Sequence, residues 1–313
     1  MPVATVLQPG LQTTVQDLGR WGSQAYGVPV AGAMDPRALR IANALVGNVA
    51  TAAGLEVAFS GPRLQFDDER VVAVAGADFE LSVDGQPVGM SRPVVVRCGS
   101  CLAFGRRRRG ARAYLSVAGG IAVPVVLGSR ATHVASRMGG LAGRAVAAGD
   151  RLPLGDTHVD PPSRLPVWPL ASDFFSPPGR LRVLPDPQHE SFAHDALALL
   201  QSAPFVVSTL SDRMGFRLTG PRLEPRAGDD FISDPTPLGA LQVPPSGQPV
   251  LLMADRQTTG GYPKLATVIT ADVHRAAQLS PGDAVSFEVC THEEAMAALI
   301  AGERAVMAFE ASG

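Results

Sequence analysis

The sequence predicts a mainly β protein made of two related β-barrel units with a few short helices. The chain has 33 glycines and 27 prolines but only 5% aromatic and 18% charged residues, which favours short strands joined by tight turns. The sequence also contains two internal repeats. "FSGPRLQF" at 59–66 resembles the segment at 218–225, and "AAGDRLPL" at 147–154 resembles the segment at 280–287. Its 313 residues suffice for two domains of about 150 residues.

Apolar, β-prone segments bounded by turn residues predict the strands. They cover residues 55–59, 70–76, 79–85, 93–98 and 112–120 in the first half, and 205–209, 249–255, 265–272 and 284–290 in the second. The arginine run at 106–109, followed by Arg112, is predicted to form a solvated hairpin turn. The alternative is phosphate or nucleic-acid binding, but the run lacks the interleaved aromatic residues of a single-strand platform.

Three helices are predicted from their start and stop signals. Asp35 can cap a helix that has Pro36 at its first position and ends at Gly47. A second helix is predicted over 190–201. Thr291 and Glu294 form a capping box for a third helix over 292–302.

A proline-rich stretch from about 155 to 180 has neither helical nor strand periodicity and is predicted to connect the two halves. We therefore predict a first β-barrel domain over 1–165, a second over 175–290 and a helical tail over 291–313.

Composition and missing motifs narrow the function. A net charge of −2 favours neither nucleic acid nor anionic membranes. Without a signal-peptide pattern or a run of about 18 apolar residues, we expect a soluble, cytoplasmic chain. Neither a GxxxxGK[ST] loop nor a GxGxxG after a strand occurs, and three cysteines with six scattered histidines lack metal-ligand spacing. We expect no metal and no cofactor bound by a recognisable motif.

The most polar stretch of the chain is "DRQTTGGYPKLATV" at 255–268, which holds the only lysine, Lys264. It follows an apolar strand, so its first residues should emerge where side chains can reach a ligand. Asp255 offers a charge partner or base, and Arg256 a planar fork that suits a carboxylate. Lysine differs from arginine as a compact charge that can lose its proton. The alternative is the chance survival of one lysine on a surface loop.

Three other loops have a similar density of polar residues, and four such loops favour a shared cleft. They contain Asp17, Arg20, Gln24 and Asp35 in the first loop, Ser211, Asp212 and Arg213 in the second, and Ser233, Asp234 and Gln242 in the third. The predicted catalytic residues are Asp255, Arg256, Lys264 and Asp35. The predicted substrate-binding residues are Arg213, Gln242, Gln257, Thr258, Thr259, Gly260, Gly261 and Tyr262.

Long segments resemble the carboxyltransferase A/B-type family, over roughly residues 5–290. They include "GLQTTVQDLGRWG", "GVPVAGAMDPRALRIANALVGN", "ARAYLSVAGGIAVPVVLGSRAT", "SDRMGFRL" and "GALQVPPSGQPVLLMADRQTTGGYPKLATV". The resemblance implies two tandem cyclophilin-like β-barrels. The family includes subunits of 5-oxoprolinase and of allophanate hydrolase and a region of urea carboxylase.

The resemblance also implies an activity and partners. We expect a subunit of an ATP-dependent 5-oxoprolinase, which opens the 5-oxoproline lactam to glutamate. Its partners would be the B subunit of that enzyme, which is similar to allophanate hydrolase subunit 1, and a third chain, the A subunit. One alternative is a biotin-dependent carboxyltransferase component that acts on a urea-like or allophanate-like amide. Another is a regulatory binding module that antagonises an inhibitor of a kinase.

Overall fold

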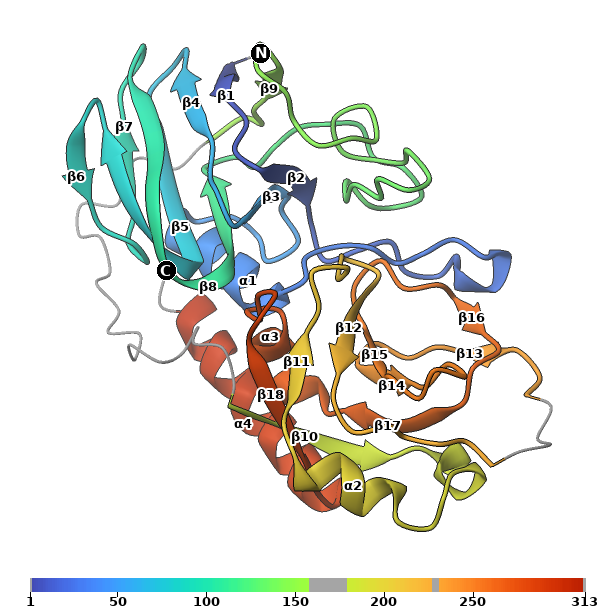
Figure 1. Cartoon of the computed structure of the whole chain (residues 1–313). Helices are drawn as coiled ribbons and strands as arrows, with labels where there is room; N and C mark the ends of the chain where they lie inside the picture. The colour runs from blue at the N-terminus through green and yellow to red at the C-terminus, as the bar shows by residue number, and fades with distance from the viewer. Residues whose placement is uncertain (1, 158–178, 227–230, 312–313) are drawn as a thin grey trace. The chain divides into compact units, whose positions relative to one another are not determined.

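The computed structural model describes residues 2–157, 179–226 and 231–311, which fall into two compact units (Figure 1). The first unit comprises residues 1–21, 31–176 and 304–313, and the second comprises 22–30 and 177–303. The mainly β prediction is confirmed. The predicted domain boundaries stay a prediction, and most of the predicted connector at 155–180 lies outside the described residues.

The described part of the first unit contains a nine-stranded sheet in the order β2-β3-β8-β4-β1-β9, with β6 and β7 attached through β5, which pairs with β8. Its strands are β1 (Val3–Gln8), β2 (Gln12–Gln16), β3 (Gly54–Ala58), β4 (Arg63–Phe66), β5 (Arg70–Val83), β6 (Gln86–Val88), β7 (Val94–Val96), β8 (Cys101–Val117) and β9 (Arg151–Pro153). β5 and β8 are long antiparallel partners, and both are prominent in Figure 1.

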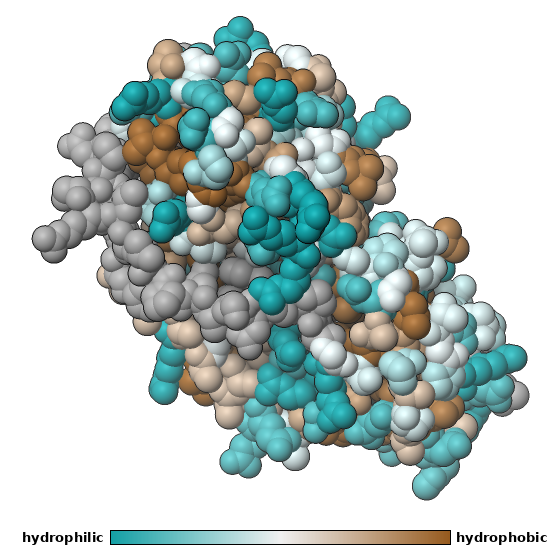
Figure 2. All heavy atoms as spheres, turned by 60° about the vertical axis from the view of Figure 1, so that its left-hand side comes forward, coloured by the Kyte–Doolittle hydropathy of each residue, from teal (hydrophilic) through white to brown (hydrophobic). Residues whose placement is uncertain are grey.

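The predicted hairpin turn at 106–109 is wrong, because these arginines lie inside the continuous strand β8. Likewise, the two strands predicted at 70–76 and 79–85 form one strand, β5. Irregular register where Asp78 pairs with Arg109 lets both strands continue past a break in the apolar pattern. Arg106, Arg108 and Arg109 are exposed, as expected for a solvated run. Figure 2 brings the β6 and β7 side forward and shows hydrophilic side chains among hydrophobic ones.

Helix α1 (Pro36–Leu45) begins and ends as predicted. The Asp35 carboxylate accepts a hydrogen bond from the backbone N–H of Ala38 at 2.9 Å, and Gly47 has a left-handed φ of 71° after the last turn. The apolar face of α1 packs on β5 and β8, with Leu39 and Ile41 buried. Local capping signals therefore sufficed to place this helix.

The described part of the second unit contains a closed barrel in the order β10-β17-β14-β15-β12-β11-β18 and a separate two-stranded ribbon of β13 and β16. The strands are β10 (Arg180–Pro185), β11 (Phe205–Val207), β12 (Gly215–Thr219), β13 (Asp234–Pro235), β14 (Ala240–Gln242), β15 (Val250–Leu252), β16 (Thr259–Gly260), β17 (Lys264–Val268) and β18 (Ala284–Val289). Phe205 and Phe287 are fully buried in its core, in edge-to-face contact with ring centroids 5.8 Å apart.

The helix predicted over 190–201 is wrong in extent. A 3₁₀ turn (Pro187–Ser191) comes first, and α2 (Ala196–Ser202) starts only after Phe192 has formed a bridge with Pro225. Phe192 is 1% exposed, so its burial overrides the local helical preference.

Two further helices also differ from the prediction. The strand predicted over 265–272 ends at Val268 and is followed by α3 (Thr270–Ala276). α4 (His292–Glu310) has the predicted capping box, with Glu294 N–H donating to Thr291 Oγ1 at 3.1 Å, but it continues past the predicted end at 302. The buried Phe309 and the ion pair between Arg40 and Glu310 stabilise the extension.

The segments 147–154 and 280–287, which resemble each other in sequence, contain matching turns. In the first unit, Ala147 N–H donates to the Asp150 carboxylate at 2.7 Å. In the second unit, Ser280 N–H donates to the Asp283 carboxylate, also at 2.7 Å. The glycine before each aspartate has a positive φ, 87° and 92° respectively. Identical local bonding supports the inference that the two units are duplicated.

In the described part of the chain, no helix is long and apolar enough to cross a membrane.

Candidate functional site

The candidate site lies on the segment between β15 and β17 of the second unit. Strand β15 ends at Leu252 and the next three residues stay buried, so the chain leaves the barrel core gradually. β16 then pairs with β13, placing Gly260 opposite Asp234 and Thr259 opposite Pro235. The ribbon thus holds two predicted polar loops side by side.

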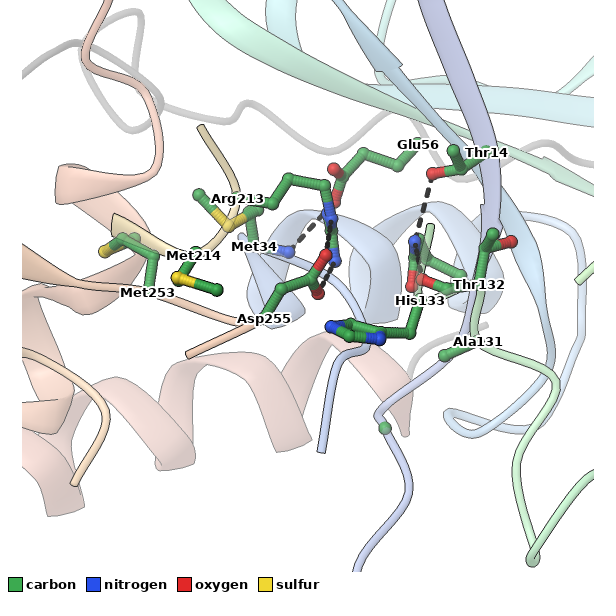
Figure 3. Close-up of polar contacts among 12 residues, drawn as sticks. Thr14, Met34, Glu56, Ala131, Thr132, His133, Arg213, Met214, Met253 and Asp255 are labelled. Atoms are coloured by element: carbon green, nitrogen blue, oxygen red, sulfur yellow. Dashed lines mark hydrogen bonds and ion pairs between the residues drawn. The ribbon is translucent and has the colours of Figure 1, made fainter. Parts of the chain in front are cut away.

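Asp255 is paired with Arg213 in a buried ion pair, which Figure 3 shows. Arg213 Nη2 lies 3.0 Å from Asp255 Oδ1, and Nε lies 3.1 Å from Oδ2. The Asp255 backbone N–H also donates to the Arg213 carbonyl at 2.9 Å. This two-point contact joins two predicted loops that are 42 residues apart. A carboxylate held in this way positions the loops and is poorly placed to act as a base.

Lys264 is buried at the start of β17, so it is not a surface-loop lysine. Its ammonium Nζ lies 2.8 Å from Asp234 Oδ2, and the two side chains are 4% and 50% exposed. The Gln188 amide accepts from the Lys264 backbone N–H at 3.0 Å and donates to Asp234 Oδ2 at 3.5 Å. The only lysine of the chain is therefore held in position with one carboxylate that reaches solvent.

A pair of glutamines extends this polar cluster. Gln257 Nε2 donates to Gln242 Oε1 at 2.9 Å, and Gln242 Nε2 donates to the Tyr262 carbonyl at 3.3 Å. A Cβ atom at Gly260 would lie 2.5 Å from Gln242 Nε2, so a larger residue there would displace the Gln242 side chain. At Gly261 the nearest side-chain atom would be 3.5 Å away, which is ordinary contact.

Arg256 contacts backbone carbonyls. Its Nε donates to the Thr236 carbonyl at 2.9 Å and its Nη1 to the Met253 carbonyl at 3.5 Å. Burial lowers the pKa of the Arg256 guanidinium from its ordinary value. The residue borders a cavity of about 230 Å³ that is lined by Gln24, Val30, Pro235, Thr236, Pro237, Arg256, Gln257 and Thr258.

A second cavity, of about 510 Å³, lies in the same unit. Gly261 and Tyr262 line it together with Phe231, Leu223, Val243, three prolines, Glu224, Arg222 and Arg226. Four of the eight predicted substrate-binding residues line these cavities, Gln257 and Thr258 the smaller one and Gly261 and Tyr262 the larger one. The other four, Arg213, Gln242, Thr259 and Gly260, line neither of the two. Thr259 is exposed on the ribbon.

The predicted catalytic residue Asp35 belongs to the first unit. It is fully buried and its carboxylate caps α1, while its backbone N–H donates to the Tyr114 hydroxyl at 2.8 Å. Tyr114 in turn donates to Glu56 at 2.7 Å. Burial first, and then the charge of Glu56, raise the pKa of Tyr114 well above its ordinary value. The catalytic role of Asp35 stays a prediction, and the observed contacts are structural.

Three members of the cluster are missing from the predicted catalytic and substrate-binding residues: Asp234, which was named only as part of a polar loop, Gln188 and Thr236. Gln188 follows Asp186–Pro187, which reads as an ordinary turn. Thr236 sits between two prolines, and its hydroxyl donates to the Gln257 carbonyl. Either could have been found only from its position opposite the 255–264 segment, because turn residues alone carry no signal of function.

Within the part of the chain that the structure describes, no group of three or more His, Cys, Asp or Glu side chains is arranged to hold a metal ion.

A match to a family of protein domains places this β-rich chain among carboxyltransferase-type domains. The family "Carboxyltransferase domain, subdomain A and B" matches residues 26–289, and the chain belongs to this family. It is 39% identical to the C subunit of 5-oxoprolinase from Escherichia coli (strain K12) over 293 residues, which are 94% of this chain and 93% of the relative. It is 37% identical to the C subunit of 5-oxoprolinase from Haemophilus influenzae over 93% of this chain and 92% of the relative.

Solved structures agree with this assignment. The crystal structure of the K. lactis urea amidolyase matches 98% of this chain with a TM-score of 0.88 and 30% identity. This chain spans 20% of that much longer protein. The fold is therefore shared between short subunits and one region of a large enzyme.

Proposed function

We propose that this chain is a subunit of an ATP-dependent 5-oxoprolinase, which opens the 5-oxoproline lactam to glutamate. The observation that supports this most strongly is the similarity to the C subunits of two 5-oxoprolinases over more than nine-tenths of both chains. The reaction adds water across the lactam C–N bond, with hydroxyl going to the carbonyl carbon and a proton to the nitrogen.

In this proposal, the Lys264 ammonium stabilises negative charge on the lactam oxygen as it develops. Burial supports this role, because a charge with little access to water interacts more strongly with a reacting group. Asp234 holds the amine directly, while Gln188 accepts from the Lys264 backbone N–H and donates to the Asp234 carboxylate. The pair of Arg213 and Asp255 holds the surrounding loops, which makes Asp255 a positioning residue.

ATP would be bound by partner chains, the B and A subunits of the enzyme, since the sequence here carries neither of the common nucleotide-binding loops. We expect the chain to be inactive alone and to form a complex that buries at least about 1,000 Å² in total. Light scattering of the mixed subunits detects the complex by its mass. A chain that stays monomeric with every candidate partner contradicts the proposal.

The direct test is formation of glutamate from 5-oxoproline and ATP by the purified complex. Lys264→Met should lower kcat roughly 100- to 1,000-fold, the loss typical of one oxyanion-stabilising donor. Lys264→Arg should also be impaired, because the guanidinium is larger and planar. Arg217→Gln, which removes an exposed charge of the same unit, is the matched control. Assembly is checked separately by light scattering, and near wild-type turnover of both Lys264 variants would give Lys264 a structural role only.

The similarity to urea amidolyase supports a second candidate, a biotin-dependent carboxyltransferase component that acts on a urea-like amide. The same complex assayed with carboxybiotin and urea separates the two candidates. Turnover that needs carboxybiotin and ignores 5-oxoproline favours the second.

A further inference from the structure

Arg256 differs from the other two buried or half-buried cations of the site in its charge balance. Arg213 is neutralised by Asp255 and Lys264 by Asp234, at 3.0 Å and 2.8 Å. Among the described residues, no carboxylate lies within ion-pair distance of Arg256. Its two polar contacts are to carbonyl oxygens, which leave the net positive charge in place. Among the described residues of the loop cluster, Arg256 is therefore the cation without a carboxylate partner.

The cavity next to Arg256 suits an anion. Its lining has no acidic side chain, and it offers the hydroxyl of Thr258 and the amides of Gln24 and Gln257 as further polar groups. Its prolines and Val30 supply an apolar wall. At about 230 Å³ it is smaller than the 300–1,000 Å³ typical of pockets for drug-sized ligands, so it suits a small metabolite.

Burial without a counter-charge is unfavourable for a guanidinium, and a bound carboxylate would offset that cost. The same burial lowers the pKa of the Arg256 guanidinium, because it disfavours the charged form. Arginine is well suited to this role because its planar fork can contact both oxygens of a carboxylate.

We propose that Arg256 binds the carboxylate of a small anionic substrate in this cavity and so determines substrate specificity. The inference rests on the proposed function, under which the ligand is 5-oxoproline, a lactam ring bearing one carboxylate. Urea is neutral and would leave the excess charge uncompensated. The cavity thus favours a lactam acid over urea.

The test compares 5-oxoproline with its carboxamide, which keeps the lactam ring and removes the charge. Equilibrium binding of both ligands to the assembled complex is measured by isothermal titration. The wild-type complex should bind the carboxamide roughly 10- to 100-fold more weakly, the usual range for a hydrogen bond to a charged group. Arg256→Gln should weaken 5-oxoproline by the same factor and leave the carboxamide unchanged. Arg217→Gln should alter neither.

Two results would overturn the inference alone: equal wild-type affinity for acid and amide, or equal weakening of both ligands by Arg256→Gln. If the wild-type complex hydrolyses 5-oxoproline in a separate assay, the proposed function stands in either case. A wild-type complex that neither binds nor hydrolyses 5-oxoproline would refute both. Preserved hydrolysis with a selective loss of acid binding in Arg256→Gln supports both.

Discussion

The ion pair between Lys264 and Asp234 is asymmetric, and this predicts unequal effects of removing its two members. The Lys264 side chain is 4% exposed and that of Asp234 is 50% exposed. Asp234→Asn leaves a buried ammonium without a carboxylate, whereas Lys264→Met leaves a carboxylate that water can solvate. The first change should therefore destabilise the protein much more than the second.

The magnitudes follow from this exposure. Breaking a fully buried pair costs about 3–5 kcal/mol, and we expect about 2–3 kcal/mol for Asp234→Asn because the amide oxygen can still accept a hydrogen bond. Lys264→Met keeps the side-chain volume and loses a pair with one solvated member, so about 1 kcal/mol is expected. The double variant should resemble Lys264→Met, because it removes the stranded charge.

Equilibrium unfolding in urea, followed by circular dichroism, measures these differences. With a denaturant slope of about 1–3 kcal/mol per molar, the midpoints of the single variants should differ by roughly 0.3–2 M. If Lys264→Met proves at least as destabilising as Asp234→Asn, the asymmetry argument is wrong. A double variant worse than Asp234→Asn would contradict it independently.

Two further predictions concern stability. Burial raises the pKa of Asp272, but hydrogen bonds from Arg182 outweigh burial and hold the pKa below its ordinary value. The ionised carboxylate therefore stabilises the folded protein above about pH 4, and this contribution is lost as the pH falls through the lower pKa of the folded state. Unfolding free energies between pH 5 and about 2 should therefore fall less steeply in Asp272→Asn than in wild type, and parallel curves would contradict this. Thr291→Ala removes the cap of α4 and should cost about 1 kcal/mol in thermal unfolding, while the exposed control Thr209→Ala should cost little.

Features encoded within a few residues were predictable from the sequence, and those set by distant contacts were not. The caps at Asp35 and Thr291 were found because donor and acceptor lie three residues apart. The long strand β8 was missed because its own sequence pattern breaks at the arginine run. Pairing with β5 keeps the strand continuous there. Tertiary packing in this way overrides local propensity.

The same division applies to the candidate site. Its loops were recognisable from the density of polar and glycine residues, but their pairing was not. The contact of Lys264 with Asp234 spans 30 residues, and that with Gln188 spans 76. No local pattern specifies contacts across such separations, because they depend on tertiary pairing such as that of β13 with β16.

The assignment of residues 22–30 to the second unit has a practical meaning for dissecting this protein. The chain leaves the first unit at Trp21 and returns to it at Ala31, long before the second unit's main segment begins. A fragment starting at residue 177 would lack Gln24 and Val30, and with them one wall of the Arg256 cavity. The two units therefore cannot be separated by a single cut in the chain. If they were expressed as two fragments, residues 22–30 would have to come from the first fragment to complete the Arg256 cavity.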